Sequence, residues 1–308
     1  MTEQRGPIAV IGCGLIGESW AALFIAYGYD VYAWDPSPTV RQGFAARLLR
    51  PISQVSAIAQ RTRGLGQLVV AETLAEAVVD AVLIQENVPE SVEIKRALYS
   101  EIEVVASEQA IIASSTSALT WSELSPGMRR PERLITAHPF NPPHLVPLVE
   151  LFGICLSTLE RADALYRAIG RKPVRLKKDA VGHIANRLAS ALWREAVHIV
   201  AEGIADVSEV DAALVNGPGL RWSVVGAHMT YHLGGGQEGI SHYLQHLGPS
   251  QVRRWASLGS PKLNVDVCEQ LIAGVTEEAG GRSVPELEAI RDSLLIKALQ
   301  AREGQDVV

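Results

Sequence analysis

The sequence predicts an α/β fold with a mostly parallel sheet in the N-terminal part and only helices in the C-terminal part. Short apolar runs alternate with helical patterns up to about residue 178, which is the arrangement of successive βαβ units. Beyond that point the strand-like runs fade and long helical patterns follow one another. We therefore expect two domains, at residues 1–179 and 180–308.

The expected strands are short apolar runs bounded by turn residues. In chain order they are residues 8–11, 30–34, 68–70, 81–84, 110–113 and 133–137. A further stretch, residues 146–151, alternates apolar and other residues and carries Glu150. Its period of two predicts a strand that buries this acid.

The expected helices of the first domain have apolar residues at helical spacing and recognisable ends. Gly28 ends the first helix, Pro51 interrupts the second, and Thr73 offers a hydroxyl to cap the third. In order, these helices are residues 15–27, 41–60, 73–77 and 91–105. The second domain is expected to contain helices at residues 182–204, 208–215 and 220–233, followed by others towards the C-terminus.

A glycine-rich turn joins the first expected strand to the first expected helix. Gly12, Gly14 and Gly17 would permit a tight turn, close approach of a pyrophosphate, and close packing of helix on strand. Asp35 ends the second strand, 18 residues after Gly17. A carboxylate there accepts hydrogen bonds from an adenosine ribose and repels a 2′-phosphate. The sequence thus predicts a Rossmann domain that binds NAD, with contacts from Gly12, Gly14, Leu15, Ile16, Gly17 and Asp35.

Composition and charge narrow the classes of partner. The chain of 308 residues has a formal net charge of −6 and no basic stripe, which argues against a nucleic-acid or anionic-membrane partner. It shows no apolar leader and no run of transmembrane length. The three cysteines are scattered and form neither a CxxC pair nor a disulfide framework. We expect a cytoplasmic protein with a small-molecule substrate and no metal site.

Three polar clusters follow expected strands, at residues 86–87, 114–117 and 138–143. Ligands of open α/β sheets bind at the carboxyl ends of the strands. An isolated buried Glu150 would be costly, so it needs a partner, and His138 is the natural one. Such a pair beside a nicotinamide is a general base that accepts an alcohol proton while hydride leaves for NAD. The alternative is a hydrogen-bonded turn histidine and an unrelated surface acid.

Together these stretches resemble the L-3-hydroxyacyl-CoA dehydrogenase superfamily over essentially the whole chain. The resemblance implies that His138 is the catalytic base and Glu150 its orienting partner, while Ser117 and Asn186 bond the reacting oxygen. It also implies an N-terminal Rossmann domain and a helical domain that forms a homodimer, with the active site between the domains. A helix-capping Ser117 and a solvent-facing Asn186 are the alternatives. The matching stretches are residues 12–17 with 35, 86–87 with 90, 114–117, 138–142, 150 and 181–187.

The resemblance places Glu86, Glu90 and Ser115 on the nicotinamide side of the cofactor site. For the two glutamates, a loop position without ligand contact is the alternative. Ser115 stands where the acyl-CoA enzymes usually have Asn, and its hydroxyl can still donate a hydrogen bond.

Other departures concern the substrate. The interval between Asp35 and Glu86 is shorter than in enzymes that hold CoA with an extended helical hairpin, so CoA binding is in doubt. Arg221 offers a planar fork for a free carboxylate, with a surface ion pair as the alternative. Trp222 lies in the region that would build an aromatic site for a trimethylammonium group, unless it packs in the core. These features look more like the branch of lambda-crystallin/L-gulonate 3-dehydrogenase and L-carnitine dehydrogenase.

The expected function is NAD-dependent interconversion of a small 3-hydroxy carboxylate, carnitine- or gulonate-like, and its 3-oxo acid. Three alternatives stay open at this point: a 3-hydroxyacyl-CoA dehydrogenase, an imine or carbonyl reductase, and a crystallin-like protein that binds NAD without turnover. The expected His–Glu pair argues against the last, because a binding protein needs no proton acceptor there.

Overall fold

The computed structural model describes residues 6–59 and 64–302. The chain divides into two compact units, Met1–Arg187 and Leu188–Val308, and each is described by itself. Residue 60, at the end of the helix expected over residues 41–60, lies outside the described residues. Within them, no helix is both long and apolar enough to cross a membrane.

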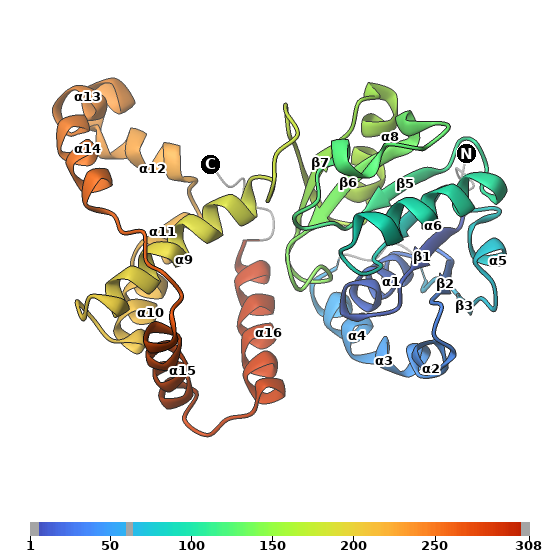
Figure 1. Ribbon diagram of the computed structural model, residues 1–308, viewed down its shortest axis with the longest axis horizontal. Coiled ribbons are helices and arrows are strands. Elements are labelled where there is room, and N and C mark those ends of the chain that lie inside the picture. The colour runs from blue at the N-terminus through green and yellow to red at the C-terminus, as the bar shows by residue number, and fades with distance from the viewer. Residues whose placement is uncertain (1–5, 60–63, 303–308) are drawn as a thin grey trace. The chain divides into compact units, whose positions relative to one another are not determined.

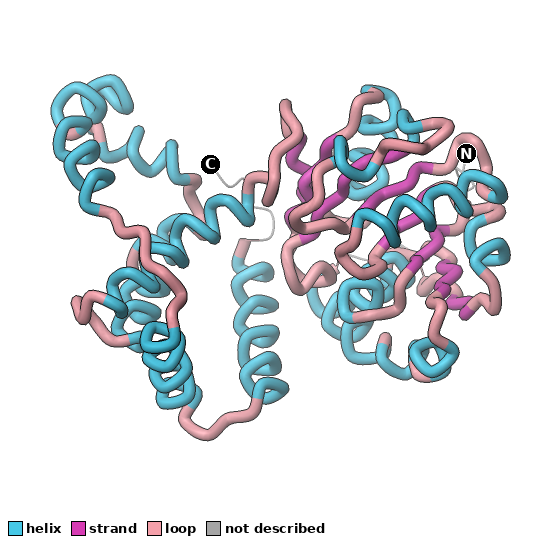
Figure 2. Tube along the Cα trace, in the orientation of Figure 1, coloured by secondary structure: helices cyan, strands magenta, loops and turns pink. Residues whose placement is uncertain are grey.

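The first unit is built on one mixed sheet, which Figures 1 and 2 show with helices packed around it. The described strands run in the order β3-β2-β1-β4-β5-β6-β7-β8. Every neighbouring pair is parallel except β6 and β7, which are antiparallel. The strands are β1 (Ile8–Ile11), β2 (Val31–Trp34), β3 (Leu68–Val70), β4 (Leu83–Glu86), β5 (Ile111–Ser114), β6 (Leu134–Pro139), β7 (Leu148–Phe152) and β8 (Lys172–Arg175).

Helices cover both faces of this sheet. In β1, the side chains of Ile8 and Val10 join one buried cluster, and those of Ala9 and Ile11 join the other, because successive residues of a strand point to opposite faces. The first cluster includes α1, α4 and α8, and the second includes α5 and α6. The helices of this unit are α1 (Leu15–Ala26), α2 (Pro38–Gln42), α3 (Phe44–Arg47), α4 (Leu49–Ile58), α5 (Leu74–Val78), α6 (Val92–Val105), α7 (Trp121–Leu124), η1 (Pro131–Arg133) and α8 (Leu156–Ala168). This arrangement confirms the predicted fold class.

Two parts of this unit differ from expectation. Where one helix was expected over residues 41–60, the structure has three short helices, α2 to α4. The divisions do not fall at Pro51, which lies inside α4. Pro51 lies in the first turn of α4, where its missing N–H would have had no partner within the helix. Strand β8 was not expected, because it is an edge strand whose Lys172 and Arg175 are exposed and whose Pro173 breaks the apolar pattern.

In the second unit the described chain is helical, as expected, but several helix bounds differ. The helix expected from residue 182 begins at residue 185, because Gly182 and His183 have positive φ. Asp206 rather than Ser208 starts the next helix, where it forms a capping box with Glu209. The helix expected over residues 220–233 is divided in two. The helices are α9 (Ala185–Ala201), which begins in the first unit, α10 (Val207–Asn216), α11 (Pro218–Trp222), α12 (Ala227–Gly234), η2 (Gly236–Glu238), α13 (Gly239–His246), α14 (Gly248–Ser257), α15 (Val265–Ala279) and α16 (Val284–Ala301).

Candidate active site

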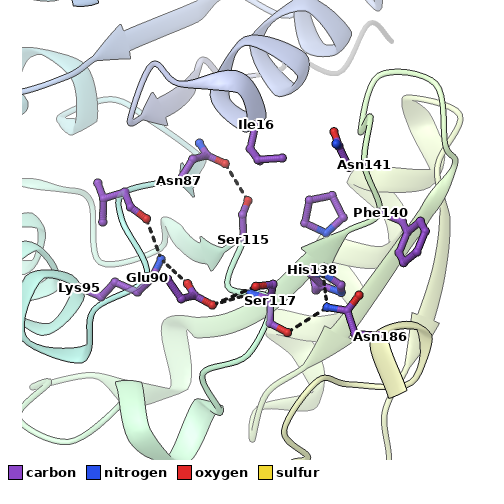
Figure 3. A pocket seen from close by; sticks show the side chains of 12 residues that line it. Ile16, Asn87, Glu90, Lys95, Ser115, Ser117, His138, Phe140, Asn141 and Asn186 are labelled. Atoms are coloured by element: carbon purple, nitrogen blue, oxygen red, sulfur yellow. Dashed lines mark hydrogen bonds and ion pairs between the residues drawn. The ribbon is translucent and has the colours of Figure 1, made fainter. Parts of the chain in front are cut away.

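A pocket of about 410 Å³ lies at the carboxyl ends of β1, β4, β5 and β6 (Figure 3). This is the edge of an open α/β sheet where ligands bind. Its walls come from the first turn of α1, from the end of β6, from the loops that follow β4, β5 and β6, from α6, and from the start of α9. The lining residues are Ile16, Asn87, Val88, Glu90, Lys95, Ser115, Ser117, His138, Pro139, Phe140, Asn141 and Asn186.

The glycine turn at residues 12–17 has little room for side chains at two positions and open space at the third. Gly12 has a φ of +90°, and a Cβ placed there would lie 2.7 Å from the carbonyl oxygen of Asn87. A Cβ on Gly17 would lie 1.9 Å from the carbonyl oxygen of Gly12. Around Gly14, by contrast, no described atom lies within 4 Å of the added Cβ. Gly12 and Gly17 allow the turn to close tightly, and Gly14 leaves its outer side open.

This turn and the end of β2 fit the dinucleotide that the sequence predicts. Gly14 begins α1 without a side-chain cap, so the amides of the first turn can bind a pyrophosphate. The Asp35 carboxylate accepts hydrogen bonds from the amides of Cys13 and Ser37, both at 2.9 Å. It is thereby fixed beside the turn with lone pairs left for ribose hydroxyls. Ile16 lines the pocket, whereas Leu15 is exposed.

His138 and Glu150 meet across the antiparallel pair of β6 and β7, where they are direct partners in the register. His138 Nδ1 lies 2.8 Å from Glu150 Oε2, and both side chains are buried. Because a carboxylate only accepts hydrogen bonds, Nδ1 carries the proton in the neutral ring. His138 Nε2 is therefore the acceptor nitrogen of the ring, and His138 lines the pocket.

The second carboxylate oxygen of Glu150 is held by the start of α9. Oε1 accepts hydrogen bonds from the amides of Ile184 at 2.8 Å and Ala185 at 3.0 Å. Burial disfavours the charged form of Glu150, but the hydrogen bonds from His138 and the two amides outweigh this. They hold the pKa of Glu150 below its usual value. The residue is thus an anion at neutral pH, with both oxygens bonded.

Ser117 and Asn186 line the pocket together with His138, on the side of its Nε2 atom. Asn186 Nδ2 donates to the backbone carbonyl of Ser117 at 3.2 Å and lies 3.5 Å from His138 Nε2 (Figure 3). Glu90 Oε1 holds the Ser117 loop by accepting from the amides of Ser117 and Ala118, at 2.8 and 3.0 Å. The structure therefore brings together four of the predicted residues: His138, Glu150, Ser117 and Asn186.

Glu86 and Glu90 occupy different environments. Glu90 lines the pocket. Glu86 is completely buried and does not line it, because its carboxylate accepts from Lys95 Nζ at 2.6 Å, Tyr99 Oη at 2.7 Å and Ser114 Oγ at 2.6 Å. Burial is the main reason why the pKa of Tyr99 lies well above its usual value, and the negative charge of Glu86 raises it further. The phenol therefore keeps its proton and stays a donor. In this structure Glu86 holds Lys95 at the pocket wall, and its contact with the cofactor stays a prediction.

The hydroxyl of Ser115 has no proton left for a ligand. It lines the pocket, but it donates to Asn87 Oδ1 at 2.7 Å. It also accepts from Trp20 Nε1 at 3.2 Å and from Gln85 Nε2 at 2.9 Å. A hydroxyl has one proton, so the expected donation from Ser115 to the cofactor is not available in this arrangement.

Two residues at the site were missed from the sequence. Lys95 is buried and lines the pocket, and it shares a helical face with the buried Leu98, Tyr99 and Ile102. A lysine on an apolar helix face was the available signal. His183 was quoted only as part of a matching stretch, and no local pattern predicts its contact with the site. Arg221 and Trp222 belong to α11 in the second unit, and their binding of substrate stays a prediction.

Comparisons with known proteins show the family of the chain. The 3-hydroxyacyl-CoA dehydrogenase NAD binding domain matches residues 7–180, and the C-terminal domain of that family matches residues 182–260. The chain is 41% identical to L-carnitine dehydrogenase of Nocardiopsis dassonvillei, over 98% of this chain and 93% of the relative. It is 40% identical to L-carnitine dehydrogenase of Bacillus cereus, over 96% and 92% of the two chains.

Among solved structures, a similar one is 5-formyl-3-hydroxy-2-methylpyridine 4-carboxylic acid 5-dehydrogenase, an NAD⁺-dependent dismutase. Its TM-score is 0.84 at 28% identity, and the match covers 98% of this chain and all of the other. These matches confirm the predicted branch, the oxidoreductase class and NAD as the cofactor. The chain belongs to the 3-hydroxyacyl-CoA dehydrogenase family and is an NAD-dependent oxidoreductase.

Proposed function

We propose that the protein interconverts a small 3-hydroxy carboxylate and its 3-oxo acid, with His138 as the general base. The observation that carries this proposal is the buried pair of His138 and Glu150, which leaves Nε2 of the pocket-lining His138 as the proton acceptor. Bound NAD supplies the hydride acceptor.

The proton transfer follows from the tautomer of His138. Its Nδ1 donates to Glu150, so Nε2 accepts the proton of the substrate hydroxyl as the alcohol is oxidised. The positive charge that then forms on the ring lies 2.8 Å from an anionic carboxylate, which stabilises it. In the reverse direction the same nitrogen returns the proton.

The surrounding polar residues would orient the reacting group. We assign Ser117 and Asn186 to the substrate oxygen, because both line the pocket beside His138. Glu90 lines the cofactor side and fixes the Ser117 loop. Glu86 acts indirectly in this proposal, since it holds Lys95 in place from beneath the pocket.

The relatives and the pocket support a compact free acid as the substrate. The relatives at about 40% identity are L-carnitine dehydrogenases, so a carnitine-like 3-hydroxy acid is the first candidate and a gulonate-like acid the second. A pocket of about 410 Å³ is suited to such a molecule. Arg221 is the proposed clamp for its carboxylate and Trp222 a proposed contact.

Residues 1–179 are the proposed cofactor domain and residues 180–308 the proposed substrate-binding and dimerisation domain.

We also propose that the second unit pairs with a second copy of this chain. Of the buried hydrophobic residues described, only Val197, Val207 and Tyr243 lie beyond residue 187. Large apolar side chains are exposed along most of the helices of this unit, which is typical of a surface that is covered in an assembly. Examples are Trp193, Leu233, Leu244, Trp255, Ile272 and Leu294. Light scattering should give the mass of two chains, and the mass of one chain would refute the homodimer.

A cytoplasmic location is consistent with the three free cysteines.

The activity is tested with a panel of substrates and one variant. L-carnitine, L-gulonate, other free 3-hydroxy acids and acetoacetyl-CoA are assayed with the cofactor while absorbance of NADH is followed. We expect turnover of a free acid, and a kcat lower by about 100-fold or more in His138→Ala. A fluorescence titration should show that this variant still binds NAD. Turnover of acetoacetyl-CoA alone would replace the proposed substrate class, and an unchanged kcat would remove His138 as the base.

A further inference from the structure

His183 contacts the proposed base but has no part in the mechanism above. It follows Gly182 in the turn before α9 and is 1% exposed. Its φ of +49° makes it the one described residue other than glycine in the left-handed region, which costs free energy for any residue that has a Cβ. Such a conformation at a buried position is a reason to look for a function.

The hydrogen bonds of His183 define its protonation state. Nε2 lies 3.1 Å from the backbone carbonyl oxygen of Thr116. A carbonyl only accepts, so Nε2 carries the proton. Nδ1 is buried and has no hydrogen-bond partner among the described residues, so a second proton there would be unpaired. Burial is also the main reason why the pKa of His183 lies below its usual value. The ring is therefore neutral.

The neutral ring of His183 packs against His138. Their centroids are 4.9 Å apart and the planes are inclined by 33°. His138 is thus contacted on two sides. Glu150 bonds its edge through Nδ1, and His183 covers part of a ring face, while the Nε2 edge stays at the pocket.

We propose that His183 is a positioning residue that stabilises the protonated form of His138 through its ring face. This inference rests on the proposed role of His138 as the base. An electron-rich aromatic face attracts a cation within about 6 Å. When His138 accepts the substrate proton, its positive charge forms against a neutral ring, which therefore attracts it and does not repel it.

The charged groups around the two rings are consistent with this role. Glu150 of β7 faces His138 directly. Glu150, and Asp179 from the segment before α9, also act on His183 and favour its protonation, as does the hydrogen bond to Thr116. Burial and the neighbouring His138 oppose it and prevail. His183 therefore stays neutral while His138 gains its proton.

Two variants separate the ring face from the hydrogen bond. His183→Leu and His183→Phe both remove the bond to Thr116 and both retain a Cβ at the strained position, but only Phe keeps an aromatic face. In each, the His138 ring is titrated by NMR with ¹³C-labelled histidine, and kcat/KM is measured against pH. Attraction of the expected size would lower the titration midpoint of His138 in the Leu variant by about 0.4 to 0.7 pH units. It would also lower kcat about 2- to 5-fold, and the Phe variant should restore both.

A second buried histidine provides the control. His144 is 6% exposed and bonds Ser19 and Gln54 rather than His138. His144→Leu should leave the midpoint of His138 unchanged. An unchanged midpoint in His183→Leu, equal shifts in the Leu and Phe variants, or the same shift in His144→Leu would each overturn the inference. The NMR titration needs no substrate, so its result is separate from the His138→Ala test of the proposed function.

Discussion

The turn before α1 and the turn before α9 both present backbone amides at the start of a helix, but in this structure only the amides at α9 are bonded to a carboxylate. At α1 the first-turn amides have no side-chain cap, and the space around Gly14 is open to a ligand. At α9 the amides of Ile184 and Ala185 are already bonded to Glu150. We propose that the first turn receives the phosphates of the cofactor, whereas the second holds a carboxylate of the candidate site.

The two turns also use glycine for different reasons. At Gly17 the limit is space, because an added Cβ would overlap the Gly12 carbonyl oxygen. At Gly182 the limit is conformation, because φ is +73° but the atoms nearest to an added Cβ are 3.6 Å away or more. Substitution by alanine should therefore have different effects on stability and on NAD binding at the two positions.

Gly17→Ala should reduce both stability and NAD binding more than any other substitution proposed in these two turns. A Cβ 1.9 Å from a backbone oxygen cannot be accommodated by a side-chain rotation, so α1 must move away from β1. We expect the free energy of unfolding to fall by about 3 kcal/mol and NAD binding to become undetectable. Denaturant unfolding and a fluorescence titration with NAD measure the two effects.

Gly182→Ala is the matched control for that change. It has room for the methyl group, so only the cost of the left-handed backbone remains, about 1 kcal/mol. NAD affinity should be unchanged. If both variants lost NAD binding equally, the distinction between a turn limited by space and one limited by conformation would be wrong.

The first turn was predictable from the sequence, and the second was not, because their determinants lie at different distances along the chain. Gly12, Gly14 and Gly17 follow a strand directly and act on neighbouring atoms. The buried Glu150 likewise stood out as the one acid on an alternating strand, and it predicts a buried partner. The amides that complete its environment come from residues 184 and 185, and no local pattern connects them with a strand so far away in the chain.

The roles of residues in buried hydrogen-bond networks do not follow from local sequence. Glu86 is the last residue of β4 and Ser115 follows the last residue of β5, and the family resemblance predicts that both lie on the nicotinamide side of the cofactor site. In the structure Glu86 accepts a hydrogen bond from Lys95 and Ser115 donates one to Asn87, and their contact with the cofactor stays a prediction. The sequence locates such residues at the correct edge of the sheet, but only three-dimensional packing shows which polar atoms remain free.

Glu150→Gln tests the internal anion of the second turn and should have a smaller effect than Gly17→Ala. The amide has no charge to stabilise the protonated ring, and its NH₂ group cannot accept the hydrogen bonds that one of the two carboxylate oxygens accepts, so kcat should fall by about 100-fold. NAD affinity should be unchanged, because the turn before α1 is untouched. Steady-state kinetics and the NAD titration check both, and a kcat equal to that of the wild type would show that the carboxylate does not support the base.

The same variant should also alter stability in acid, and this is the smallest effect. The folded protein holds the pKa of Glu150 below its ordinary value of 4.5. The ionised carboxylate therefore adds stability above that value, and this contribution is lost as pH falls through the lowered pKa. Glu150→Gln has no such contribution to lose, so its free energy of unfolding should decline less steeply below about pH 4.5 than that of the wild type. Denaturant unfolding at a series of pH values compares the two slopes. Parallel slopes would mean that neither the hydrogen bond from His138 nor the amides at the start of α9 favour the anion, and the likeness between the two turns would then be one of shape alone.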